Sequence, residues 1–154
     1  MAQYSGGSHG GSGTPAESIR LTGAQVEQFF TPAGYANVNV EGQRIGTILA
    51  RQSVTRSQAR NILDSFQRIT EAWESLDEME RVRSIGRLEP QLIYLAGREL
   101  NPYKKALLRD FAETVKLCIT AVESAGSPDR RNRYTVVVDF IEAITAYHRL
   151  TSRI

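Results

Sequence analysis

Apolar side chains recur at alternating steps of three and four between residues 59 and 76, and this pattern constrains the fold more than any other feature. The residues of the stripe are Ala59, Ile62, Leu63, Phe66, Ile69, Trp73 and Leu76. This period puts all of them on one face of an α-helix of about six turns. Ser53 or Thr55 can cap its first turn. The pattern predicts a long helix that packs its apolar face against other helices.

Shorter helices are predicted before this element. Residues 21–30 form a helix with Thr22 as its N-cap, and Pro32 and Gly34 end it. Residues 35–41 are expected to form a loop. A weaker helix follows over residues 41–52.

Three further helices are predicted after it. Pro90 is expected to begin the first, which closes at Asn101, and Gly97 within it is expected to permit the close approach of a neighbour. Residues 103–123 form an amphipathic helix that breaks at residues 125–128. The last helix covers residues 131–150, where the helical period outweighs the strand propensity of three successive valines. The chain is therefore predicted to be all-α, a compact bundle of five to six helices.

The N-terminal segment has a different composition. Residues 1–18 are rich in Gly and Ser and contain almost no aliphatic side chain, so they cannot bury enough apolar surface to offset their ordering entropy. We expect a disordered tail at residues 1–18 and one helical domain at residues 19–154. No run is long and apolar enough to cross a membrane. Cys118 is the only cysteine and lies in an apolar run, which indicates a core thiol and a reducing, cytoplasmic setting.

The sequence offers no catalytic constellation. His9 lies in the predicted tail, and His148 shares an apolar helix face, where a hydrogen-bonded core residue is expected. Too few Cys and His are present for a zinc site. The acidic block at residues 71–80 lacks the pattern of a calcium loop and is interpreted as a solvated helix face. Asp139 and Glu142 are expected to form a surface ion pair with Arg149. We therefore predict that the protein is not an enzyme and binds no metal or other cofactor.

Arginine dominates the positive charge. It supplies sixteen of the nineteen basic residues, and the charges are segregated along the chain. Five bases and one acid lie between residues 44 and 68, and seven bases and two acids between residues 81 and 109. Arginine binds phosphate through a bidentate fork, so such a surface suits a nucleic-acid backbone. A solvated surface with internal salt bridges is the equal alternative at this point.

Helical geometry locates the exposed basic residues. Arg56 and Arg60 project away from the apolar stripe, one turn and roughly 6 Å apart along the axis. Gln91, Tyr94 and Arg98 share one edge of the next helix. The competing interpretation is local pairing, of Asp64 with Arg60 or Arg68 and of Glu99 with Arg98.

Three motifs in fixed order carry a resemblance to a known family. They are Thr-x-Ser-Gln-x-Arg at residues 55–60, Pro-x-Leu-x-Tyr-x-Ala-x-Arg at residues 90–98, and Phe-x-Glu-Ala-x-x-Ala-Tyr-His at residues 140–148. Together they resemble the small subunit of the type III-A CRISPR effector complex, the Csm complex. The family often has lysine after the proline, where this chain has Gln91, so one phosphate contact is replaced by a hydrogen bond or lost.

The resemblance implies a cytoplasmic, non-catalytic protein that lines the duplex of guide RNA and target RNA. Its implied partners are these RNAs, the backbone and large subunits of the complex, and other copies of itself. The RNA-binding residues implied by the resemblance or by their position are Arg51, Arg56, Arg60, Gln91, Tyr94, Arg98 and Lys104. Two alternatives remain: the small subunit of the type III-B complex, and a helical adaptor that binds protein without RNA.

Overall fold

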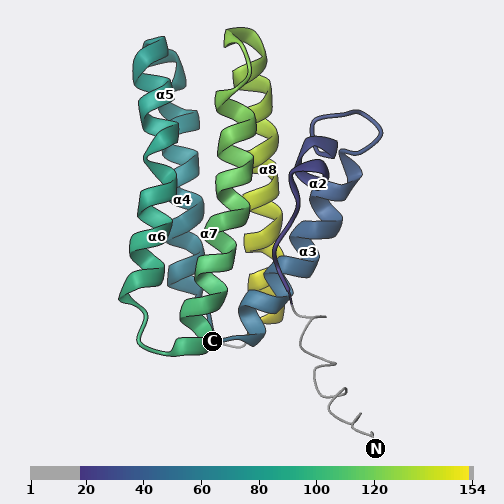
Figure 1. Ribbon diagram of the computed structural model, residues 1–154, viewed down its shortest axis with the longest axis vertical. Coiled ribbons are helices and arrows are strands. Elements are labelled where there is room, and N and C mark those ends of the chain that lie inside the picture. The colour runs from purple at the N-terminus through teal and green to yellow at the C-terminus, as the bar shows by residue number, and fades with distance from the viewer. Residues whose placement is uncertain (1–17, 153–154) are drawn as a thin grey trace, which may run out of the picture.

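The computed structural model describes residues 18–152, and every regular element in this range is helical (Figure 1). This confirms the predicted all-α bundle. The tail predicted for residues 1–18 lies, apart from Ser18, outside the described residues. The elements are α2 (Gly23–Gln28), α3 (Ala36–Arg51), α4 (Arg56–Ala72), the 3₁₀ helix η3 (Trp73–Ser75), α5 (Glu78–Gly86), α6 (Leu88–Arg98), α7 (Pro102–Glu123) and α8 (Ser127–Thr151).

Four long helices run side by side along the length of the molecule. Figure 1 shows α4, α6, α7 and α8 nearly parallel to the long axis, with α3 packed along α8 on the other side. The helix α5 lies at the end where α4 and η3 lead into α6. The short helix α2 packs near α7 at the same end as the start of α3.

The long predicted helix is α4, and its cap and stripe are as expected. The Thr55 hydroxyl accepts a hydrogen bond from the Gln58 backbone N–H at 3.1 Å, and the Gln58 side chain accepts one from the Thr55 N–H at 3.0 Å. This reciprocal box satisfies two orphan donors of the first turn. Ser53, the other candidate cap, has a φ of 70° and turns the chain after α3. The predicted end at residue 76 was too late, because α4 ends at Ala72 and passes into η3.

Helix α8 holds α4 through two buried polar contacts. The Tyr134 hydroxyl donates to the Phe66 carbonyl oxygen at 2.7 Å, and burial raises the pKa of this hydroxyl. Near the other end of α8, the His148 Nε2 atom lies 2.6 Å from the Val54 carbonyl oxygen. This confirms His148 as a buried, hydrogen-bonded core residue. The two contacts fix α4 against α8 near its start and past its middle.

The prediction of a loop at residues 35–41 is wrong. A single helix, α3, runs from Ala36 to Arg51, and Val38 is buried in the core. Asparagine and β-branched residues alternate here and weaken the local helix propensity. Packing along α8 overrides that propensity, because the helix gains buried apolar surface over its whole length.

Two glycines of α3 allow this packing. A Cβ atom on Gly42 would lie 2.5 Å from the Ala143 Cβ atom, and one on Gly46 would lie 2.3 Å from the Ile144 carbonyl oxygen. Only glycine fits at either position. The close approach predicted for Gly97 does not occur, since a Cβ atom there would meet nothing within 4 Å.

Other helix limits also differ from prediction. Helix α6 begins at Leu88, so Pro90 is its third residue, where the backbone N–H has no intrahelical partner. Helix α8 begins at Ser127, before the predicted residue 131. Helix α5 was not predicted as a separate element. Its start is capped by Asp77, whose side chain accepts a hydrogen bond from the Glu80 N–H at 2.8 Å.

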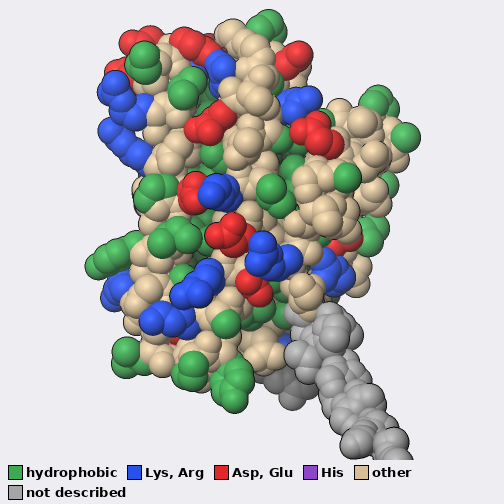
Figure 2. Space-filling model, viewed as in Figure 1, with side chains coloured by type: hydrophobic (Ala, Val, Ile, Leu, Met, Phe, Trp, Pro, Cys, Tyr) green, Lys and Arg blue, Asp and Glu red, His purple; other side chains and the backbone are tan. Residues whose placement is uncertain are grey.

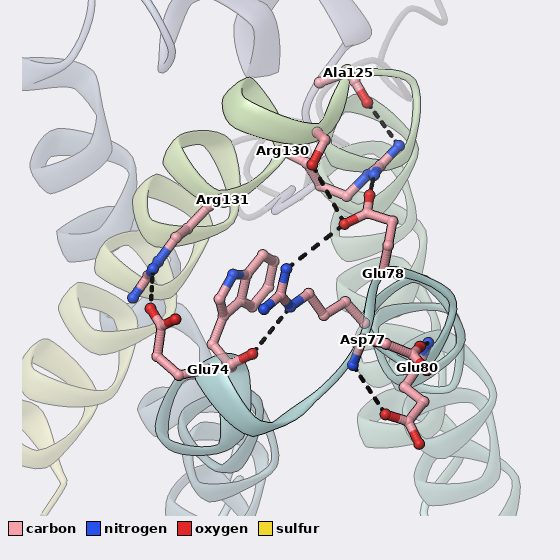
Figure 3. Close-up of polar contacts among 10 residues, drawn as sticks. Glu74, Asp77, Glu78, Glu80, Ala125, Arg130 and Arg131 are labelled. Carbon is pink, nitrogen blue, oxygen red and sulfur yellow. Dashed lines mark hydrogen bonds and ion pairs between the residues drawn. The ribbon is translucent and has the colours of Figure 1, made fainter.

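The acidic block at residues 71–80 is only partly a solvated face. Figure 3 shows two of its carboxylates paired with arginines in the first turns of α8. Glu78 pairs with Arg130, and Glu74 pairs with Arg131. These ion pairs join η3 and the start of α5 to the start of α8.

We predict that Gly46→Ala destabilises the protein. The added methyl group would collide with the α8 backbone, and overpacking of this kind lowers the free energy of unfolding by about 1–3 kcal/mol. Thermal and urea unfolding followed by circular dichroism measure it. Gly97→Ala is the matched control, because the same change in open space should keep or slightly raise stability. Equal unfolding midpoints for the two variants would contradict the proposed role of Gly46.

Candidate nucleic-acid interface

Helix α4 forms a ridge between two grooves. We call the hollow of about 200 Å³ between α4 and α8 the α4/α8 groove. We call the hollow on the other flank, between α4 and α6, the α4/α6 groove; it consists of two adjoining parts of about 180 Å³ and about 170 Å³. Five of the seven predicted site residues are divided between the two grooves, so the structure does not gather the seven into one cluster.

Arg56 and Arg60 line the α4/α8 groove and are exposed. The Arg56 Nη2 atom donates to the Ser152 carbonyl oxygen at 3.2 Å, which leaves other guanidinium donors open. Arg60 forms no ion pair within the described part of the chain. The alternative of local pairing through Asp64 is therefore not realised for Arg60 or for Arg68. Free guanidinium groups on an exposed ridge can form bidentate contacts with phosphate.

Arg149 of α8 completes the α4/α8 groove, and sequence reasoning missed this role. Its predicted ion pair with Asp139 and Glu142 does not form. Asp139 accepts a hydrogen bond from the Tyr35 hydroxyl at 2.6 Å, which raises the pKa of Tyr35. Glu142 accepts one from the Gln67 side chain at 2.9 Å. Both carboxylates thus face α3 or α4, and Arg149 is left exposed beside the ridge.

Gln91, Tyr94 and Arg98 line the α4/α6 groove, as their shared edge predicted. The Arg98 guanidinium lies 5.7 Å from the centroid of the Tyr94 ring, and the Tyr94 residue is 68% exposed. Two further arginines, Arg68 and Arg87, line the adjoining part of the groove and were not predicted. Their signal in the sequence was weak, because Arg68 belongs to α4 and Arg87 to the turn between α5 and α6, and the two meet only through the packing of α4 on α6.

The last two predicted residues lie near one end of the bundle. Arg51 is exposed in the last turn of α3. Lys104 forms an ion pair with Glu99 at 3.3 Å, and its side chain is only 13% exposed. A hydrogen bond from the Asn101 backbone, assisted by Lys104, lowers the pKa of Glu99. Lys104 therefore closes the turn between α6 and α7, which leaves it less available to a ligand than Arg51.

Charge is unevenly distributed along the face of the bundle that Figure 2 shows. In Figure 2, acidic side chains are densest at the end of the molecule where α5 lies, and Lys and Arg side chains dominate the opposite end. This matches the segregation seen in the sequence. A polyanion would be attracted to the basic end and repelled by the acidic one.

Groups with catalytic potential are buried or isolated in the described residues. No group of three or more His, Cys, Asp or Glu side chains there could hold a metal ion. His9 lies outside the described residues. Cys118 is fully buried, and burial raises its pKa to about 12. None of the described helices is long and apolar enough to span a bilayer.

We predict that Cys118 is inert in the folded protein. Its raised pKa keeps it a thiol from neutral pH to pH 9, and the thiolate is the reactive form. Labelling with a thiol-specific reagent at pH 8 should be slow in buffer and rapid in denaturant. Rapid stoichiometric labelling under native conditions would show that the core around α7 is open.

A comparison with protein-family models gave one result. The model described as Csm2 Type III-A matches residues 33–153, which include both grooves and all the predicted site residues. Comparisons with curated proteins and with solved structures gave no match.

Proposed function

Because the chain belongs to the Csm2 Type III-A family and is thus a small subunit of the type III-A CRISPR effector complex, we propose that it binds the duplex of guide RNA and target RNA. The contacts are made to sugar and phosphate by exposed arginines of the α4 ridge. Since they involve the backbone, binding is independent of base sequence and weakens with salt.

One observation carries this proposal: Arg60 is exposed on α4, one turn from Arg56, and forms no ion pair within the described residues. An exposed pair with Asp64 would contribute about 0.3–0.5 kcal/mol, yet it does not form. Arg60 therefore adds little to the stability of the fold. Its position suits a ligand, and Arg149 across the α4/α8 groove adds charge of the same sign.

The remaining predicted residues extend this surface. Arg51 continues it at the end of α3, and Arg98, with Tyr94 and Gln91, continues it on the α6 side of the ridge. Lys104, at the turn that follows Arg98, adds positive charge to this surface although its ammonium group pairs with Glu99. These assignments stay proposals.

We further propose that the protein acts without catalysing a reaction or carrying a cofactor. It stacks as several copies along the RNA duplex in the cytoplasm, beside the backbone and large subunits. These other subunits perform the cutting. The type III-A match decides against the type III-B alternative. The helical adaptor that contacts only protein is the alternative that the next experiment tests.

We predict that Arg60→Ala weakens the binding of target RNA by the assembled effector complex to the same extent for different target sequences. Loss of one phosphate contact should also reduce the slope of log K against log salt concentration by about one. Filter binding or fluorescence anisotropy over a series of salt concentrations measures both quantities. Arg60→Lys should keep most of the slope, because the charge remains.

Arg20→Ala is the matched control. Arg20 is an exposed arginine that lies 3.8 Å from Asp110 of α7, away from both grooves. Its removal should leave the affinity and the slope unchanged. An unchanged slope for Arg60→Ala, together with loss of other subunits from the complex, would favour the protein adaptor.

A further inference from the structure

The α4/α6 groove has an apolar floor that phosphate contacts do not use. Its larger part is floored by Ile62, Phe66, Leu88 and Leu92, and it joins the second part through Ser65, Leu88 and Gln91. The hydrophobic effect favours binding in such a hollow only when the ligand covers it with apolar surface of its own.

The charge around this floor has a single sign. Arg68, Arg87 and Arg98 line the groove, and no carboxylate is among its lining residues. None of the three arginines forms an ion pair in the described part of the chain; the Arg98 guanidinium instead lies over the Tyr94 ring. A groove with an apolar floor and an arginine rim fits a ligand that is both flat and apolar and negatively charged.

Two polar side chains of the groove are also free. The side-chain amides of Gln91 and Asn61 have no hydrogen-bond partner among the described residues, and each offers a donor and an acceptor. Tyr94 adds an exposed ring at the edge of the hollow. Aromatic rings with arginines at their side are the usual platform for a single nucleobase.

We propose that the α4/α6 groove binds an unpaired nucleotide of the RNA. The base enters the apolar hollow and stacks on Tyr94, its edge faces the amides of Gln91 and Asn61, and its neighbouring phosphates contact Arg68 and Arg87. This inference rests on the proposed function, since the RNA must first lie along the α4 ridge.

Two arguments favour this occupant. A base inside a duplex is covered on both faces by its neighbours, so only a base outside the stack can cover the floor of the hollow. The two grooves also flank the same helix, since α4 supplies Arg60 beside one groove and Arg68 in the other. An RNA that contacts the ridge through Arg60 therefore lies close to the α4/α6 groove.

The test uses the full chain and two RNA duplexes. One carries a single bulged 2-aminopurine, and the other is identical but fully paired. The bulged duplex should bind about tenfold more tightly, with its fluorescence quenched by stacking. Tyr94→Ala should remove the preference and the quenching, and Tyr94→Phe should keep both. Arg60→Ala should weaken both duplexes equally and leave the preference intact.

Each other outcome overturns the inference in a distinguishable way. Equal binding of the two duplexes, without quenching but with the loss caused by Arg60→Ala, overturns the base site and leaves the proposed function standing. Failure of both duplexes to bind overturns the two together. If quenching is absent and native mass spectrometry shows that Tyr94→Ala complexes lose a neighbouring subunit, the groove is a protein contact.

Discussion

Burial of the apolar stripe of α4 is the constraint on which the rest of the structure depends. Ile62, Phe66 and Ile69 are each no more than 7% exposed, and burial of such side chains stabilises the fold by about 1.5–3 kcal/mol each. An exposed ion pair contributes far less. The stripe therefore sets the rotation of the helix about its axis. Once it faces the core, Arg60 and Arg68 must face outward, whatever their charges would favour.

Arginines serve two different purposes in this chain. Arg130 and Arg131, at the start of α8, pair with Glu78 and Glu74 and join the α5 end to α8. The arginines of the α4 ridge and of the α4/α6 groove have no such partners among the described residues. Asp64 lines the α4/α8 groove beside Arg60, yet no ion pair joins the two side chains, and two other acids, Glu74 and Glu78, pair with arginines of α8. The arginines of the ridge thus remain unpaired although one carboxylate shares their groove.

Elements that are specified by residues close together in the sequence were predicted, and elements that depend on distant residues were not. The start and stripe of α4 followed from residues a few positions apart, and so did the outward direction of Arg56 and Arg60. The start of α3 was missed, because its stability comes from α8, about a hundred residues away. The same holds for the glycines: Gly97 lies in the motif that drew attention, but Gly46 is the one that touches another backbone.

For the same reason, only part of the candidate site could be predicted from the sequence. Helical period could place Tyr94 and Arg98 on one edge, but it could not show that α4 lies across from them. Arg68, Arg87 and Arg149 became candidates only when two helices enclosed a groove. Whether a residue lines a groove depends on which two helices pack together. The sequence of one chain does not show which helices are neighbours.

The two grooves differ in a way that bears on how one strand of RNA can be held. The α4/α8 groove mixes Arg56, Arg60 and Arg149 with one carboxylate, Asp64. Its arginines attract phosphate, and the carboxylate of Asp64 weakens that attraction. The α4/α6 groove combines uncompensated arginines with an apolar floor. Backbone contacts alone cannot distinguish a paired nucleotide from an unpaired one, because both carry the same phosphate. In the proposed complex the second groove makes that distinction, because its floor is covered only when a base leaves the stack.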